Sequence, residues 1–227
     1  MIKHSFLWAV SFLFAFEVLA LPPMDEHERA FTEIYDKCVW GRNDNGEGFS
    51  GGGSLLQNTL PYIDYLKKFM KDKKIKSVVD AGCGDWEFSK YMDWTGVQYR
   101  GYDVVRNVIE KNKERFSQPN IQFFQGNFIN TNLPSADLFL CKHVLQHLTN
   151  KDILLFLPQL SKYKYCLITN EVEPKTLSGD NRDTIIGGAH KLDLTKPPFN
   201  VKATTVLTYY IGNSSVHQVI LIDNSKK

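Results

Sequence analysis

The residues best suited to do chemistry stand at the ends of two apolar runs. Asp80-Ala81-Gly82-Cys83-Gly84 directly follows the apolar run 75–79, and a second acid, Asp103, ends the run 97–102, 23 residues after Asp80. A Gly-x-Gly turn lets the backbone approach a ligand closely at the carboxyl end of a strand. A carboxylate at the end of the next strand can accept hydrogen bonds from both hydroxyls of a ribose. The two motifs therefore predict a site for a nucleoside-containing ligand.

Two histidines follow a later apolar run. His143 and His147 come just after residues 136–141 and are four residues apart, which on one helical face suggests either a metal site or a general base. The sequence shows no third ligand at a suitable spacing, so we expect no metal. We expect His147 to be a packing residue, whereas His143, nearer the strand end, is either a surface residue or an active-site base.

The elements that must position these residues alternate along the chain. Short apolar runs at 75–79, 97–102, 121–124, 136–141 and 165–171 read as strands, and 107–116 and 151–160 read as helices between them. Strands that alternate with helices predict a parallel sheet covered on both faces. Residues 203–211 and 218–222, joined by Gly212-Asn213-Ser214-Ser215, predict an antiparallel hairpin at one edge of the sheet.

Two long loops flank this core. The first, 41–54, is rich in glycine, and such a loop is flexible until a ligand orders it. The second, 179–199, shows little periodicity, and a loop of that length in a compact domain usually has a function. We interpret the pair as lids on the substrate side, with a plain surface connection as the alternative for the second.

Four motifs in order resemble one known family. VVDAGCGDW, YRGYDVV, FFQGNF and ADLFLCKHVLQHL are similar to the strand-end motifs of the class I S-adenosylmethionine-dependent methyltransferases, over roughly Tyr35 to the C-terminus. The resemblance implies an α/β, Rossmann-like, mostly parallel seven-stranded sheet with helices on both faces and a C-terminal antiparallel hairpin. It also implies S-adenosyl-L-methionine as the cofactor. The residues that we expect at the cofactor are Asp80, Gly82, Gly84, Asp103, Asn127, Trp40 and Lys142, with His143 as the candidate catalytic residue.

Two positions depart from the usual pattern of that family. Trp86 stands where a third glycine is usual, and Asn127 stands where an aspartate is commoner. Asn127 keeps an acceptor oxygen, so the change is mild. Trp86 adds bulk, and we expect it over the cofactor entrance, where it would close the pocket or stack on the ligand.

The resemblance implies in-line transfer of a methyl group to an oxygen or nitrogen of a small-molecule or glycan acceptor. Two other classes of function stay open at this point. One is a secreted, non-catalytic protein that keeps the fold, and the other is an NAD-dependent oxidoreductase. The second is disfavoured because dinucleotide binding calls for a glycine where Glu87 stands.

Composition limits the organisation and the partners. The chain has 227 residues, 43% of them hydrophobic, which suits one substantial core. We divide it into a signal peptide (1–20), an N-terminal helical and glycine-loop cap (21–74) and a methyltransferase domain (75–227). A formal charge of +2 with no long basic run outside 67–76 is not typical of a nucleic-acid binder.

The N-terminus predicts a secretory signal. Lys3 precedes the uncharged apolar run Phe6 to Phe16, which is too short to span a bilayer, and Ala20 suits cleavage. We therefore expect a protein of the secretory lumen or exterior without stable membrane insertion, or a cytoplasmic one if this segment is not a signal. The four cysteines do not form a disulfide pattern, and we expect buried thiols.

Overall fold

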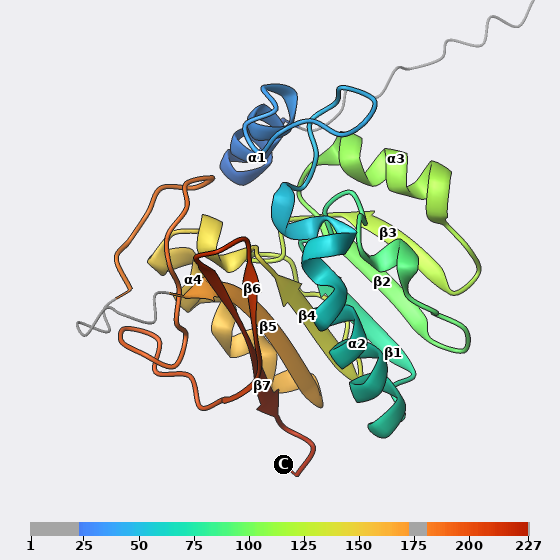
Figure 1. The fold of residues 1–227 in the computed structure, drawn as a ribbon, viewed down its shortest axis with the longest axis vertical. Coiled ribbons are helices and arrows are strands. Elements are labelled where there is room, and N and C mark those ends of the chain that lie inside the picture. The colour runs from blue at the N-terminus through green and yellow to red at the C-terminus, as the bar shows by residue number, and fades with distance from the viewer. Residues whose placement is uncertain (1–22, 173–180, 227) are drawn as a thin grey trace, which may run out of the picture.

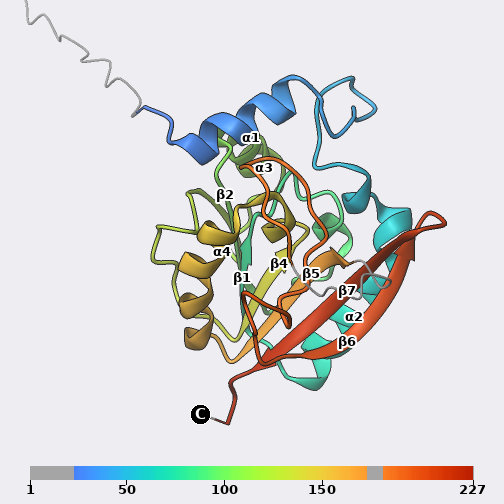
Figure 2. The same cartoon turned by 90° about the vertical axis from the view of Figure 1, so that its left-hand side faces the viewer.

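The computed structural model describes residues 23–172 and 181–226, and these build one seven-stranded sheet with helices on both faces (Figures 1 and 2). The strand order is β3-β2-β1-β4-β5-β7-β6. The strands are β1 (Ser77–Ala81), β2 (Gln98–Asp103), β3 (Ile121–Gln125), β4 (Leu138–Lys142), β5 (Tyr165–Val172), β6 (Thr204–Ile211) and β7 (Ser215–Asp223). The α-helices are α1 (Glu26–Asp36), α2 (Leu56–Asp72), α3 (Arg106–Phe116) and α4 (Asn150–Phe156).

The first five strands are parallel, and β7 runs antiparallel between β5 and β6. Each predicted apolar run became a strand within a few residues of its expected bounds, and the predicted hairpin lies at the β6 edge. The predicted fold class is therefore confirmed. Because the strands are parallel, the carboxyl ends of β1, β2 and β4 meet at one edge of the sheet, where the motifs with possible chemistry lie.

Strand alternation divides the core into two layers. On one face Val79, Phe139 and Ile168 belong to the cluster that includes the buried side of α4, and on the other face Val78 and Leu140 pack in the cluster that includes α2. Successive residues of a strand point to opposite faces, and both faces are covered, which explains why these runs are apolar throughout. Helix α2 thus lies against the sheet as part of the main core (Figure 1).

One predicted helix is shorter than expected. The span 151–160 divides into α4 and a following 3-10 helix, Leu157–Lys162. Pro158 stands at the start of that second segment and has no backbone N–H to continue the α-helical hydrogen bonds. The sequence periodicity predicted one continuous α-helix, but its second half is the tighter 3-10 helix.

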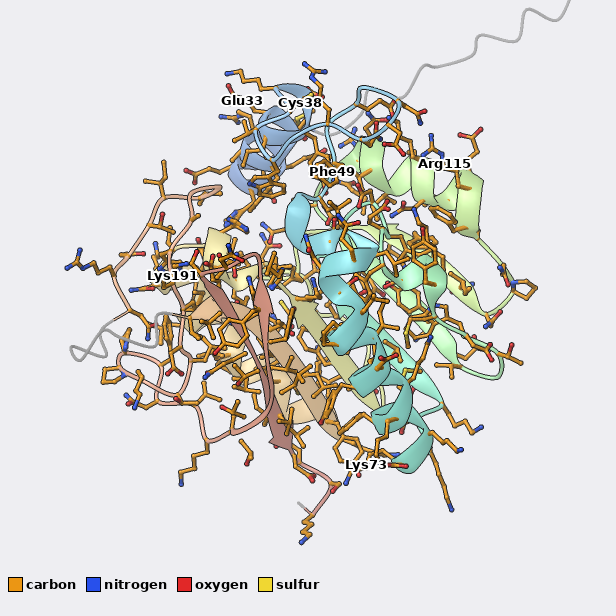
Figure 3. All side chains as sticks on the ribbon, in the orientation of Figure 1. Glu33, Cys38, Phe49, Lys73, Arg115 and Lys191 are labelled. Atoms are coloured by element: carbon orange, nitrogen blue, oxygen red, sulfur yellow. The ribbon has the colours of Figure 1, made fainter. Side chains whose placement is uncertain are left out.

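The two long loops differ in how they are fixed. In the first, Phe49 is buried between α1 and α2, far from Lys73 at the other end of α2 (Figure 3). In the second, residues 181–203 contain neither helix nor strand, yet Leu192 and Leu194 are buried in the core on the α4 face. Residues 173–180 and the predicted signal peptide lie outside the described residues.

Three of the four cysteines, Cys83, Cys141 and Cys166, are buried, and none of the four forms a disulfide within the described residues. This matches the prediction of thiols in or beside core strands. Across residues 23–172 and 181–226, no helix combines the length and the apolar character that crossing a membrane requires.

Candidate active site

A pocket opens at the carboxyl edge of the sheet, above β1, β2 and β4. It encloses about 820 Å³ of empty space, its open mouth included. The motif residues Gly82, Gly84, Asp103, Asn127, Lys142 and His143 all line it, and so does Trp40. Seven of the eight predicted site residues therefore meet in one cavity.

Both glycines of the turn after β1 are required by space as well as by conformation. Gly82 and Gly84 have φ of 75° and 54°, the left-handed region that side chains disfavour. A Cβ atom on Gly82 would lie 2.4 Å from Cγ2 of Val144, and one on Gly84 would lie 2.2 Å from Oγ of Ser50. The turn thus presents bare backbone to the pocket.

Asp103 holds this turn in place. Its two carboxylate oxygens accept hydrogen bonds from the backbone N–H of Gly84 and of Val105, each at 3.0 Å. Only 9% of the residue is exposed, and burial raises the pKa of its carboxyl to about 6 in spite of these bonds. Each oxygen has a second acceptor site, so the carboxylate that shapes the turn can also accept from ligand hydroxyls.

Asp80 differs from its predicted position at the pocket wall. It is 3% exposed, accepts a hydrogen bond from the Tyr99 hydroxyl at 2.6 Å, and is not among the residues that line the cavity. Burial raises the pKa of its carboxyl to about 6, and the hydrogen bond from Tyr99 opposes that rise. In the structure Asp80 supports the turn from beneath.

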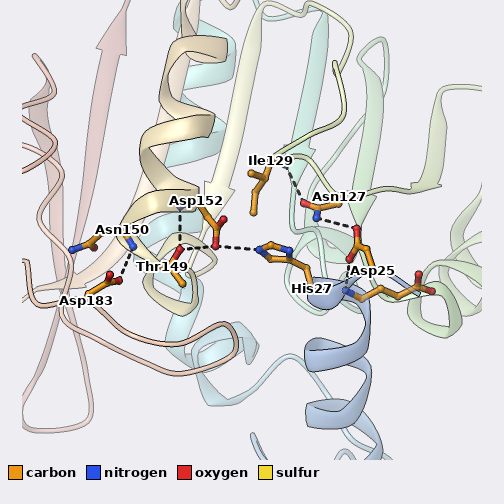
Figure 4. A network of polar contacts seen from close by, with 9 residues as sticks. Asp25, His27, Asn127, Ile129, Thr149, Asn150, Asp152 and Asp183 are labelled. Atoms are coloured by element: carbon orange, nitrogen blue, oxygen red, sulfur yellow. Dashed lines mark hydrogen bonds and ion pairs between the residues drawn. The ribbon is translucent and has the colours of Figure 1, made fainter. Parts of the chain in front are cut away.

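Asn127 links the pocket to α1, as Figure 4 shows. Its amide Nδ2 donates to Asp25 at 3.1 Å, and its Oδ1 accepts from the backbone N–H of Ile129 at 3.1 Å. Asp25 is also the N-cap of α1, because its other oxygen accepts from the N–H of Glu28 at 2.8 Å. One carboxylate therefore begins the helix and fixes it to the site.

Helix α1, which belongs to the segment 21–74 predicted as a cap, forms the roof of the pocket, although the sequence analysis named none of its residues as part of the site. His27, Phe31 and Tyr35 all line the cavity, and they recur every fourth residue along one helical face. His27 also contacts Asp152 of α4, with 3.2 Å between Nε2 and Oδ2 (Figure 4). The spacing of His27, Phe31 and Tyr35 can be seen in the sequence and indicates one helical face, but it does not say which surface that face covers.

The glycine-rich loop is attached to the turn after β1 by a reciprocal pair of hydrogen bonds. The N–H of Ser50 donates to Asp85 at 3.1 Å, and the N–H of Asp85 donates to the Ser50 hydroxyl at 3.0 Å. The Tyr35 hydroxyl lies 2.7 Å from that same oxygen. The loop, the turn and α1 are thus joined at Ser50, a residue to which the sequence analysis assigned no role.

Lys142 and His143 form the wall at the end of β4. Nζ of Lys142 donates to the carbonyl of Gly53 at 2.6 Å and lies 3.3 Å from Nδ1 of His143. Burial lowers the pKa of Lys142 to about 7, although the charge of Asp80 opposes this. Burial, and then the neighbouring charge of Lys142, lowers the pKa of His143 as well.

The prediction for Trp86 is wrong. The residue is 4% exposed, does not line the pocket, and packs on Tyr99, Phe116 and Phe123, with ring centres 5.0 to 5.6 Å apart. Its φ of 60° turns the side chain into the α2-side core. Trp86 therefore packs in the core beside the strand end and not against the pocket.

His147 packs against Trp40, and both side chains also line the pocket. The rings of Trp40 and His147 are 4.9 Å apart, and Nδ1 of His147 donates to the carbonyl of Gly188 at 2.6 Å. His143 and His147 do not share a helical face, because only residues 145–147 form a short 3-10 turn. Within the described part of the chain, no group of three or more His, Cys, Asp or Glu side chains could hold a metal ion.

One protein-family model matches part of this sequence, and several solved structures share its fold. Residues 79–161 match a protein-family model described as "Methyltransferase domain". Magnesium protoporphyrin IX methyltransferase from Synechocystis PCC 6803, solved with bound S-adenosylhomocysteine, is 13% identical, with 85% of this chain and 97% of that chain covered and a TM-score of 0.55. Human N-acetylserotonin methyltransferase in complex with S-adenosylmethionine is 16% identical, with 87% and 67% covered and a TM-score of 0.51.

A third similar structure is that of PigF with S-adenosylhomocysteine. It is 12% identical, with 74% of this chain and 56% of that chain covered, and the TM-score is 0.55. No curated protein sequence matches the chain.

The fold, the glycine turn with the Asp103 carboxylate that holds it, and the family match point to one class of domain. The chain carries a class I methyltransferase domain, and the cofactor of this class is S-adenosylmethionine. Over most of its length the chain is similar in fold to methyltransferases solved with S-adenosylmethionine or S-adenosylhomocysteine.

Proposed function

We propose that this methyltransferase transfers the methyl group of S-adenosylmethionine to an oxygen or nitrogen of a small-molecule or glycan acceptor. The observation that carries the proposal is the shared pocket, in which the bare turn of Gly82 and Gly84, the Asp103 carboxylate and the Lys142-His143 wall face one cavity. S-adenosylmethionine supplies a methyl group on a sulfonium, which needs little more than an aligned nucleophile.

Each of these residues binds a different part of the cofactor in this proposal. Asp103 is placed to accept from the ribose hydroxyls, Asn127 lies on the side where the adenine would bind, and Gly82 and Gly84 leave room for the backbone to approach the methionine part. The aromatic face of Trp40 can steady a cation. Holding both reactants in line can lower a barrier by about 7 to 11 kcal/mol.

The enclosure of the pocket supports a small acceptor over a bulky one. Helix α1 lies over the cavity and is fixed to it through Asp25 and His27, and the loop around Ser50 closes a second side. A group that reaches Lys142 and His143 must therefore enter past aromatic side chains. This arrangement suits a small molecule or the terminal unit of a glycan.

We further propose, from residues 1–20, that the protein enters the secretory route. The support is the charge and length pattern of the N-terminal segment.

Calorimetric titration with S-adenosylhomocysteine and with NAD tests the cofactor assignment. We expect saturable binding of S-adenosylhomocysteine and none of NAD. Incubation of the protein with labelled cofactor and a metabolite or glycan extract, followed by mass spectrometry, then identifies the labelled product. Binding without any labelled product in extracts from the native source would favour a non-catalytic protein that keeps the fold.

A further inference from the structure

Five polar side chains meet behind the Lys142-His143 wall, and we call them the polar cluster: Tyr62, Lys142, His143, Tyr209 and His217. Nζ of Lys142 lies 5.8 Å from the ring centre of Tyr62. The imidazoles of His143 and His217 are 4.6 Å apart, and His217 stacks on Tyr209 at 5.4 Å. Helix α2, the end of β4, β6 and β7 therefore each contribute to one group.

Strand alternation explains why these side chains share a face. Leu140, Leu167 and Val219 belong to the apolar layer beneath α2. Two residues further toward the pocket edge, the same face of β4 and β7 carries Lys142 and His217. The core therefore changes from apolar to polar at the level where the methyl group would be transferred.

Several polar atoms of the cluster have no hydrogen-bond partner among residues 23–172 and 181–226. They are Nε2 of His143, both ring nitrogens of His217 and the hydroxyls of Tyr62 and Tyr209, and all are buried. His217 is 5% exposed and Tyr209 is 4% exposed. Of the cluster, Lys142 and His143 line the pocket, and the other three members lie behind them. Buried polar groups without partners destabilise a fold, so several in a layer that reaches the pocket indicate a ligand that pairs with them.

The cluster is rich in donors and has a positive bias. Lys142 has three N–H donors, of which one goes to the carbonyl of Gly53 and another faces Nδ1 of His143, so one remains. Tyr209 adds an O–H, and each neutral imidazole adds one N–H. Glu171, opposite His217 in the sheet register, is already paired with Lys191. Asp80 accepts from Tyr99. The remaining donors, together with the sulfonium of the cofactor, favour an anionic oxygen ligand.

We propose that the polar cluster binds a carboxylate of the acceptor and that this carboxylate receives the methyl group, an inference that rests on the proposed function. One carboxylate oxygen forms a bond to the methyl carbon while the bond from that carbon to sulfur breaks, and its electron pair stays on sulfur. The products are a methyl ester and S-adenosylhomocysteine. No proton leaves the acceptor, so His143 binds and orients the acceptor here and does not act as a base.

The test uses benzoate and its neutral isostere benzamide as probes, titrated into the full chain saturated with S-adenosylhomocysteine. We expect benzoate to bind at least tenfold more tightly than benzamide. Lys142→Met and Tyr209→Phe should each weaken benzoate binding about tenfold, because each removes a donor to a charged oxygen, and should leave benzamide binding unchanged.

Tyr210→Phe is the matched control. Tyr210 is the next residue on β6, points to the other face and is 67% exposed, so the same change there should leave benzoate binding unaltered. Equal binding of the two probes, or no binding of benzoate, overturns the inference. A loss of both probes in Tyr209→Phe would show a merely structural role and overturn it too. Because binding of S-adenosylhomocysteine is measured first, its failure would instead count against the proposed function.

Discussion

Replacing Asp103 by Asn should separate cofactor binding from stability. The carboxylate can accept from two ribose hydroxyls, and a hydrogen bond to a charged group contributes about 1.5 to 3 kcal/mol. The amide keeps one acceptor oxygen and turns a donor toward the ribose. Since about 1.4 kcal/mol corresponds to a factor of ten, we expect the affinity for S-adenosylhomocysteine to fall at least about tenfold at pH 7.

The stability of the ligand-free protein should change little in Asp103→Asn. Burial raises the pKa of this carboxyl from 3.8 to about 6, so keeping it ionised at pH 7 costs about 3 kcal/mol, at about 1.4 kcal/mol for each pKa unit. The amide removes that cost but leaves one of the N–H groups of Gly84 and Val105 without an acceptor, a loss of about 1 to 3 kcal/mol. The two effects nearly cancel.

Asp103→Ala is the comparison, because it removes the charge and both acceptors together. It should lose affinity at least as strongly and should be destabilised by up to about 3 kcal/mol, the difference between two unpaired N–H groups and the relieved charge. Calorimetric titration and urea unfolding of the three proteins measure both quantities. Wild-type affinity in a folded Asp103→Ala protein would refute the role of this carboxylate.

Four further results are expected. Lowering the pH from 7 to 5 should weaken binding of S-adenosylhomocysteine about tenfold. The reason is that the ribose hydroxyls favour the ionised form of Asp103, whose pKa in the free protein is about 6. Titration calorimetry measures this, and an affinity that does not change with pH would contradict it. Gly82→Ala should lower the free energy of unfolding in urea by more than about 1 kcal/mol, since its Cβ would lie 2.4 Å from Val144 at a φ of 75°. His27→Ala should speed hydrogen exchange across α1 and release of S-adenosylhomocysteine, and unchanged rates would show that the helix is held by other contacts. N-terminal sequencing from the native source should find the chain beginning after Ala20, and an intact Met-initiated chain would disprove the signal.

The sheet was predictable because its signals are local. The run that ends at Asp80 and the one that ends at Asp103 are each short, apolar and followed by a break, and the order of such runs defines the topology. The positions of Gly82 and Gly84 follow from the same turn. The sequence was sufficient to predict the position of a residue when that position depends only on the strand that the residue follows.

The roles that were missed depend on contacts between distant segments. Trp86 stands beside the glycine turn in sequence, but aromatic partners from β2, α3 and β3 draw it into the core. Lys142 is fixed by Gly53, which is 89 residues away. Asp80 lies near the end of its strand as expected, yet its carboxylate accepts a hydrogen bond from the Tyr99 hydroxyl and does not line the cavity. Such pairings cannot be obtained from spacing along one chain.

The double duty of Asp25 has a kinetic consequence. One of its oxygens starts α1 and the other holds the Asn127 amide, so a ligand that takes over this amide removes one of the links between the helix and the pocket. If the exchange of S-adenosylhomocysteine for fresh cofactor requires α1 to leave the pocket, the rate of that undocking sets an upper bound on the turnover rate, whatever the speed of the methyl transfer.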